Sequence, residues 1–130
     1  MSDRMPNFGV GTEKTDTPSE FRLSDHGILV GVTIAAAARD SGNTPTTTLR
    51  RGLVVGKITA SGKYAQYDNT ATDGTGTAAG ILVHEVDLLG PYASAQDATG
   101  LMLVHGYVKE SVCIGLDEDG KADLKHVNFG

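Results

Sequence analysis

The sequence contains no tryptophan, a single cysteine and few aromatic residues of any kind. One thiol, Cys113, excludes an internal disulfide and any metal site built from several cysteines. It lies in the apolar run Val112-Cys113-Ile114, which favours a buried structural thiol. Four tyrosines and three phenylalanines are the entire aromatic supply. A ligand site lined by aromatic side chains would have to be built from these seven residues.

Long hydrophobic segments are also missing. The longest apolar stretch, Ile28 to Ala38, covers 11 residues even when Gly31 and Thr33 are counted, which is too short to span a bilayer. The first residues, MSDRMPNF, lack the apolar core of a secretory signal. We therefore expect a soluble protein that is made in a cytoplasm and has no membrane partner.

Positive charge is scarce. Eleven Lys and Arg stand against 16 Asp and Glu, and the net charge of −5 argues against a general nucleic-acid binder. Four of the basic residues are close together without an intervening acid: Arg50, Arg51, Lys57 and Lys63. Such a cluster is typical of a solvated face. The alternative is a contact with an oppositely charged patch on another subunit.

Glycine is abundant, with 17 of 130 positions. The length corresponds to one domain, and this much glycine is typical of short strands joined by many turns. Because apolar residues make up only 39% of the chain, burial within one molecule is expected to be supplemented by burial against another chain.

A β-meander is predicted at the centre of the chain, from Leu49 to Val86. Its β-branched and apolar runs are separated by turn residues such as Ser61-Gly62 and Asp73-Gly74. Further strands are predicted at 26–34, 101–108, 112–116 and 127–129, with an extended connector at 44–48. Helical turns are predicted at 35–38, at 93–98 within a loop over 87–99, and as a short helix at 122–126. The sequence predicts one mainly β domain over residues 26–130.

Residues 1–25 differ from this domain. They are rich in Ser, Asp, Glu, Thr, Pro and Gly, and four isolated hydrophobic residues follow neither strand nor helix period: Phe8, Val10, Phe21 and Leu23. Such a segment buries too little apolar area to offset its ordering entropy, so we expect a flexible arm. It is either a frayed terminus or an arm that orders on a partner.

No pattern of catalytic or metal-binding residues is convincing. His84 and His105 are on separate predicted strands without a local ligand partner, and a structural role is favoured for both. Residues 117–120 depart from the order of a calcium-binding loop, and residues 73–76 lack the Lys and Ser/Thr of a phosphate-binding loop. We predict no catalytic, cofactor or metal site and no enzyme activity. An enzyme that uses His84 or His105 stays open, as does a small β-barrel that binds a ligand or peptide.

Four short motifs together resemble one family: Arg51-Gly52-Leu53-Val54-Val55, Gly62-Lys63-Tyr64, Ala78-Ala79-Gly80-Ile81-Leu82 and Gly106-Tyr107-Val108. They are similar to segments of the lambda-type head decoration proteins of tailed phages. The end of the chain, Leu124 to Phe129, is similar to that family's short helix running into a last strand.

The resemblance implies a small mainly β domain, barrel- or tulip-like, with short helical turns and an extended N-terminal arm. It also implies a homotrimer at threefold positions on the outside of a phage head, where it would stabilise the shell against packaged DNA. The partner would be the major capsid protein, without nucleic acid or cofactor. The arm would order on the capsid, with Phe8, Val10, Phe21 and Leu23 as anchors.

Overall fold

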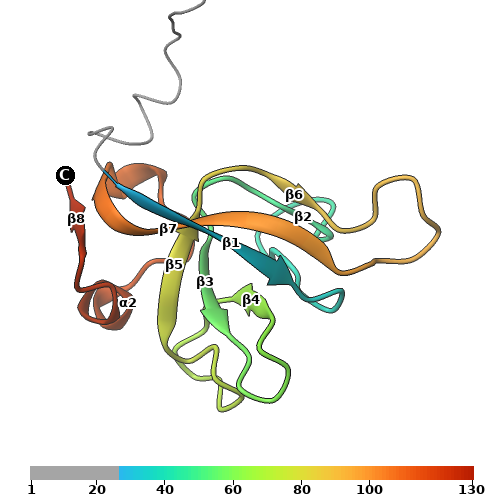
Figure 1. The fold of residues 1–130 in the computed structure, drawn as a ribbon, viewed down its shortest axis with the longest axis horizontal. Helices are drawn as coiled ribbons and strands as arrows, with labels where there is room; N and C mark the ends of the chain where they lie inside the picture. Colours follow the sequence, from blue (N-terminus) through green and yellow to red (C-terminus); the bar gives the residue numbers. More distant parts are fainter. Residues whose placement is uncertain (1–26) are drawn as a thin grey trace, which may run out of the picture.

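The structure, a computed structural model, describes residues 27–130 (Figure 1). The predicted arm over residues 1–25, its four hydrophobic anchors and the expected domain start at residue 26 all lie outside the described residues.

The described chain is mainly β, as predicted. Two short helical elements follow the seventh strand: a 3-10 turn, η1 (Glu110–Val112), and an α-helix, α2 (Glu118–Asp123). The strands are β1 (Ile28–Ile34), β2 (Thr48–Leu49), β3 (Val54–Lys57), β4 (Tyr64–Gln66), β5 (Ala78–Leu82), β6 (Val86–Asp87), β7 (Ala98–Val108) and β8 (Val127–Phe129).

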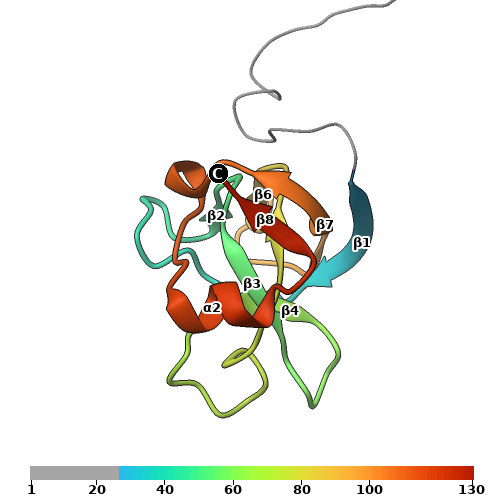
Figure 2. The ribbon, with the colours of Figure 1, turned by 90° about the vertical axis from the view of Figure 1, so that its left-hand side faces the viewer.

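Five of the strands close into a barrel. Their order is β1-β4-β3-β5-β7, and β1 returns to pair with β7 over its whole length. β7 is long enough to pair with β5 through its middle and, in parallel, with β8 at its end. β2 and β6 form a separate two-stranded sheet. Figure 2 shows β8 and α2 together on one side of the barrel.

The barrel strands carry apolar residues on both faces. Val55 belongs to a core cluster with Ile34, Leu82 and Met102, whereas its neighbour Val54 belongs to a second cluster. Adjacent residues of a strand point to opposite faces, so consecutive apolar residues imply burial on both sides. In the second cluster, Leu124 at the end of α2 and Val127 of β8 cover the outer face of the barrel strands. Their partners on those strands include Ile81 of β5 and Leu103 and Val108 of β7.

The predicted central meander is wrong in its pairing. β5 pairs with β3 and not with β4, so β3 lies between the other two. The reason is the segment between β4 and β5, which is too long for a tight hairpin. It is folded by two Asx turns in which Asp68 and Asp73 accept hydrogen bonds from Thr70 and Thr75.

Several local predictions also need correction. The predicted helical turn at 93–98 is a bent loop that Gln96 N closes on Leu88 O, and β7 already begins at Ala98. The predicted strand at 112–116 is a 3-10 turn followed by a single bridge, Leu53↔Ile114. The helix predicted at 122–126 lies at 118–123, because Asp117 caps it by accepting a hydrogen bond from Gly120 N. The pairing of β2 with β6 was not predicted.

Candidate binding surface

The two ends of the described chain lie on neighbouring positions of β7. Ile28, where β1 begins, is paired with His105, and Asn128 of β8 is paired with Tyr107 two residues further on. Figure 1 shows the start of β1 and the end of β8 at the same side of the barrel. The described part of the chain therefore begins beside the place where it ends.

Exposed hydrophobic side chains gather at this end. Ile28 is 55% exposed, Leu29 36%, Val30 38% and Tyr107 41%. We call these four residues the apolar patch. Tyr92, in the loop between β6 and β7, is the other large exposed hydrophobic residue among residues 27–130. Because a cluster of exposed apolar side chains marks an interaction site more often than a single one does, the patch is the first candidate for a binding surface.

β1 also has an unpaired edge beside the patch. Its partner on one side is β7, along all seven residues, but on the other side it pairs with β4 only at Ile34↔Tyr64. Among residues 27–130, positions 28 to 32 have no backbone partner on that second side. We call this the open edge of β1. A row of unpaired N–H and C=O groups is a template for another strand.

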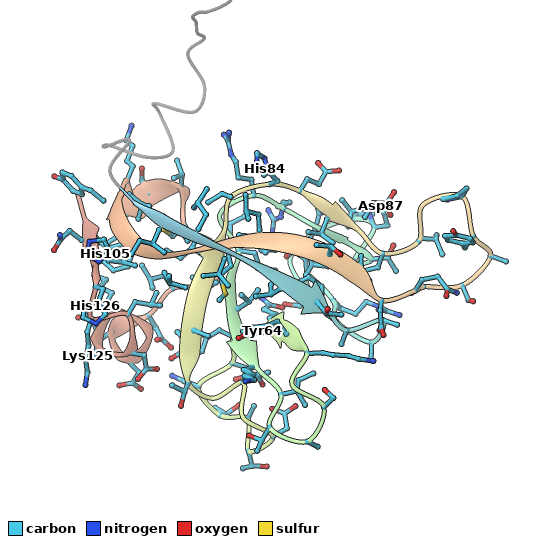
Figure 3. All side chains as sticks on the ribbon, in the orientation of Figure 1. Tyr64, His84, Asp87, His105, Lys125 and His126 are labelled. Atoms are coloured by element: carbon cyan, nitrogen blue, oxygen red, sulfur yellow. The ribbon has the colours of Figure 1, made fainter. Side chains whose placement is uncertain are left out.

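The histidines considered as candidates are not brought together. His84 lies in the exposed loop after β5, whereas His105 lies at the far end of β7 (Figure 3). The neighbour of His105 is His126, with ring centroids 6.0 Å apart, because Gly106 and Val127 are paired in β7 and β8. Within residues 27–130 no three His, Cys, Asp or Glu side chains are grouped so that they would hold a metal ion.

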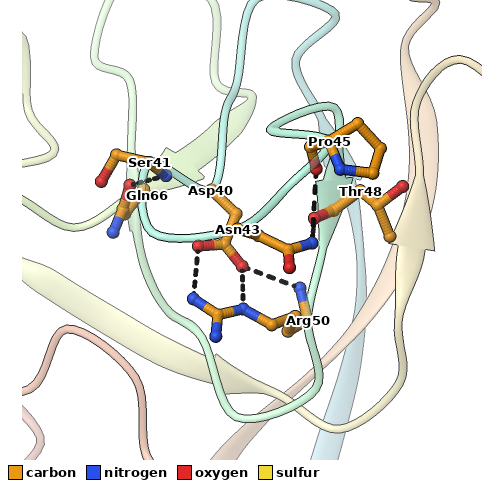
Figure 4. A network of polar contacts seen from close by, with 7 residues as sticks. All are labelled: Asp40, Ser41, Asn43, Pro45, Thr48, Arg50 and Gln66. Carbon is orange, nitrogen blue, oxygen red and sulfur yellow. Dashed lines mark hydrogen bonds and ion pairs between the residues drawn. The ribbon is translucent and has the colours of Figure 1, made fainter.

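Asp40 and Arg50 form an ion pair that closes the loop between β1 and β2 (Figure 4). The guanidinium of Arg50 donates to both carboxylate oxygens, at 2.8 and 3.0 Å, and its backbone N–H donates at 3.1 Å. These bonds hold the pKa of Asp40 below its usual value, against the opposing effect of burial. The carboxylate is buried and accepts three hydrogen bonds from one residue, which indicates a structural role.

The basic cluster is partly neutralised within the chain. Besides the Arg50 pair, Lys63 Nζ lies 2.6 Å from Asp97 Oδ2, and Asp97 Oδ1 accepts a bond from Ala36 N. Two of the four clustered basic residues thus have intramolecular acidic partners. This pairing reduces the positive charge that the cluster presents, and the contact with another subunit stays a prediction.

A polar cavity of about 230 Å³ lies between the end of β4 and the start of α2. Asp117 at its wall accepts hydrogen bonds from Gly120 N, from the hydroxyl of Tyr67 and from the amide of Asn69, which together lower its pKa. The cavity is lined by Ser41, Gln66, Tyr67, Asp68, Asn69, Gly115 and Asp117.

This cavity does not match the small β-barrel that binds a ligand or peptide, which was the alternative function left open by the sequence. Sites for small molecules are mostly apolar and usually exceed about 300 Å³. Of the four tyrosines, Tyr67 alone lines it, and its hydroxyl is already bonded to Asp117. Tyr92 and Tyr107 are exposed on separate parts of the domain. The ring cluster that such a module requires is therefore not formed by the described residues.

Cys113 is half-buried, so the prediction of a buried thiol holds only in part. Burial, with a smaller contribution from Glu110, raises the pKa of this thiol to about 11. A thiol that is protonated at neutral pH is a poor nucleophile, which favours a structural role.

The sequence profile of the family described as bacteriophage lambda head decoration protein D matches residues 15–124. The chain belongs to this family. The resemblance inferred from the four motifs is thereby confirmed, and the β-barrel agrees with it. No curated protein sequence matches the chain significantly.

Lambda-type head decoration proteins are structural phage proteins associated with the capsid, and not a family of enzymes. In the described part of this member, no helix is long and apolar enough to cross a membrane. The sequence singled out the arm and missed the apolar patch and the open edge. Apolar residues at 28–30 are typical of a buried strand, and the sequence carries no signal that their neighbours leave them uncovered.

Proposed function

We propose that this protein is a capsid decoration protein that acts as a homotrimer at threefold positions on the outside of the phage head. There it binds neighbouring subunits of the major capsid protein and stabilises the shell against packaged DNA. Membership of the head decoration family over residues 15–124 is the observation that carries the proposal. It acts without catalysis, cofactor, nucleic acid or membrane, after synthesis in the host cytoplasm.

The arm is the proposed capsid contact. Residues 1–25 carry Phe8, Val10, Phe21 and Leu23 as spaced anchors, and they join the domain next to the apolar patch. Ordering a backbone costs about 1–2 kcal/mol per residue, so only a partner surface would hold many of these residues in place. Three arms on one trimer would bind multivalently, because each bound arm raises the local concentration of the next.

Deletion of residues 1–20 tests this function. The shortened protein is expected to keep its trimer and its melting temperature, but to lose most of its co-sedimentation with expanded heads that lack decoration. A double variant, Phe8→Ser with Val10→Ser, should weaken binding in the same direction, whereas Thr12→Ser in the same arm should not.

Two outcomes would contradict the proposal. Equal binding by the full-length and shortened proteins would exclude the arm as the main contact. If neither protein bound to heads of the cognate phage, the decoration role itself would be wrong.

A further inference from the structure

The open edge of β1 offers backbone hydrogen-bonding groups at every second residue. Val83 N donates to Leu101 O, so Leu101, the β7 partner of Gly31, directs its backbone groups toward the β5 side. Gly31 therefore directs its own N–H and C=O away from β7, and Leu29 does the same because strand geometry has a period of two. A side chain added at Gly31 would meet nothing within 4 Å, which leaves room on this part of the strand.

This edge lacks the features that usually protect an exposed strand. Edge strands are commonly very short, or carry charges or proline, and these features prevent the addition of another strand. β1 is seven residues long, and residues 27–38 contain no charged residue and no proline. By contrast, the edge strand β8 has three residues. We therefore expect the open edge of β1 to be covered when the protein is assembled.

The side chains at the start of β1 are uncovered on one particular face. Val32 and Ile34 are buried, and by strand alternation Ile28 and Val30 lie on the same face, yet remain 55% and 38% exposed. β1 therefore continues an inward-facing apolar row beyond the point where its neighbours cover it. A strand added at the open edge, with hydrophobic residues at alternate positions, would cover both exposed side chains.

Positively charged and ionisable side chains lie beside this apolar row. Ile28 is paired with His105, and paired residues of neighbouring strands direct their side chains to the same face. The ring centroid of His105 lies 6.0 Å from that of His126, which follows the exposed Lys125 in the sequence. Figure 3 shows these three side chains on the side of the barrel where β1 begins. Carboxylates on an added strand would find complementary charge here.

We propose that the open edge of β1 receives an extended acidic segment of the major capsid protein, which adds to the barrel as a β-strand. Hydrophobic residues at alternate positions of the segment cover Ile28 and Val30, and its carboxylates reach Lys125. The inference rests on the capsid role proposed above and identifies a second contact, on the folded domain. Residues 1–25 directly precede this region in the sequence, so the arm and the edge form one continuous binding region.

A proline at the edge tests strand addition. Gly31→Pro removes an N–H that faces the open side and leaves the pairing with β7 in place, since proline is tolerated at such positions of edge strands. Gly31→Ala is the matched control. In co-sedimentation with expanded heads that lack decoration, the apparent affinity should fall at least about tenfold for Gly31→Pro and stay unchanged for Gly31→Ala. Equal binding by Gly31→Pro and the unchanged protein would overturn the proposal.

The apolar row is tested without a change in the backbone, which covers the case in which Gly31→Pro does not fold. The double variant Ile28→Ser with Val30→Ser should weaken binding to the same heads at least about tenfold. The control is Tyr92→Ser, which removes a hydrophobic side chain that is 60% exposed in the loop between β6 and β7. Equal affinities of the double variant and the control would contradict the added strand.

Charge reversal tests the acidic character of the segment. Lys125→Glu should weaken binding at least about threefold, and the effect should shrink as salt is added. Lys57→Glu, at another exposed position, changes the net charge equally and should bind as the unchanged protein does. Equal affinities of the two variants would exclude an acidic partner at this end of β1.

Hydrogen exchange identifies the occupant of the edge. Amides of Leu29 and Gly31 should exchange quickly in the free protein and at least about tenfold more slowly on heads. The amides of Val30 and Val32 face β7 and should be protected in both states, which reports that the barrel is intact. Slow exchange of Leu29 and Gly31 in the free protein would assign the edge to the chain itself or to a second copy, and would overturn the proposal.

These outcomes distinguish the added strand from the decoration role. If the unchanged protein binds heads and the β1 variants bind equally well, the added strand is wrong and the decoration role stands. If the unchanged protein does not bind heads of the cognate phage, both are wrong.

Discussion

Asp40 is fully buried, and both of its carboxylate oxygens accept hydrogen bonds from Arg50. Only the guanidinium side of the pair reaches solvent, since the Arg50 side chain is 38% exposed. The pair ties the loop between β1 and β2 to the segment that enters β3. Asp40 N also donates to Thr46 O, so the loop folds around the carboxylate. Removal of this anion should loosen the connection between β1 and β3.

Replacement of Asp40 by Asn should lower the free energy of unfolding by about 2 kcal/mol, because a charged acceptor of three hydrogen bonds is lost from a buried position. The control is Glu118→Gln, which removes a carboxylate that is 91% exposed in its pair with Lys121. Denaturant titration at neutral pH compares the two variants. Equal stability of Asp40→Asn and the unchanged protein would contradict a structural role for the pair.

The contribution of Asp40 should depend on pH in one direction. Its pKa is lowered in the folded protein, chiefly by the Arg50 hydrogen bonds, from an ordinary value of 3.8. A lowered pKa stabilises the fold above the unfolded value, and this contribution disappears as the pH falls through the folded value. The stability difference from Asp40→Asn should therefore be constant near neutrality and shrink below about pH 4. A difference that grows on acidification would contradict this assignment.

The hydroxyl of Tyr67, a residue only 4% exposed, donates to Asp117 at 2.7 Å. Tyr67→Phe should therefore cost about 1–2 kcal/mol of stability, while Tyr92→Phe, at a 60% exposed position, should cost almost nothing. Burial first, and then the bond to Asp117, raises the pKa of Tyr67. In an alkaline absorbance titration, Tyr67 should therefore ionise above the ordinary range of a tyrosine. Ionisation of Tyr67 within the ordinary range, while the protein is still folded, would argue against the buried bond.

Gly80 of β5 packs tightly against β7. A Cβ at this position would collide with the side chain of Met102 and lie 2.9 Å from Leu103 O. Gly80→Ala should cost about 2 kcal/mol through overpacking. Gly31→Ala is the matched control in another barrel strand, because its Cβ would meet nothing within 4 Å. Thermal melting of both variants tests whether β5 and β7 pack tightly at Gly80. Equal melting temperatures would show that the two strands have room to separate.

Strand positions were largely readable from the sequence, whereas their pairing was not. Runs such as Leu53-Val54-Val55 and Gly80-Ile81-Leu82 are β-branched or apolar and bounded by turns, so β3 and β5 were found close to their true bounds. The closure of the barrel depends on β1 meeting β7, about seventy residues later, and no local pattern encodes that contact.

Candidate binding surfaces could be predicted from the sequence only where the composition of a segment is unusual. The arm stands out because its hydrophobic residues are sparse among polar ones. The apolar patch does not, since Ile28-Leu29-Val30 is typical of an ordinary buried strand and becomes a surface only because β4 pairs with the other end of β1. Likewise, Asp40 and Arg50 are ten positions apart in the sequence, and their pairing depends on how the intervening loop folds.

Oligomerisation is the part of the proposed function that can be tested without capsids. The chain has a lean apolar content, and hydrophobic side chains remain exposed on β1 and β7 in the single chain. In a closed ring every copy buries the same heterologous contact, so no interacting patch is left exposed. An open assembly leaves such a patch exposed at its ends. Light scattering on a size-exclusion column at micromolar protein should report three times the 13.5 kDa chain mass. The melting temperature should rise with protein concentration, because assembly stabilises the folded state by mass action. A monomer at every concentration, with a melting temperature that does not change, would contradict the trimer while leaving the barrel and its family membership intact.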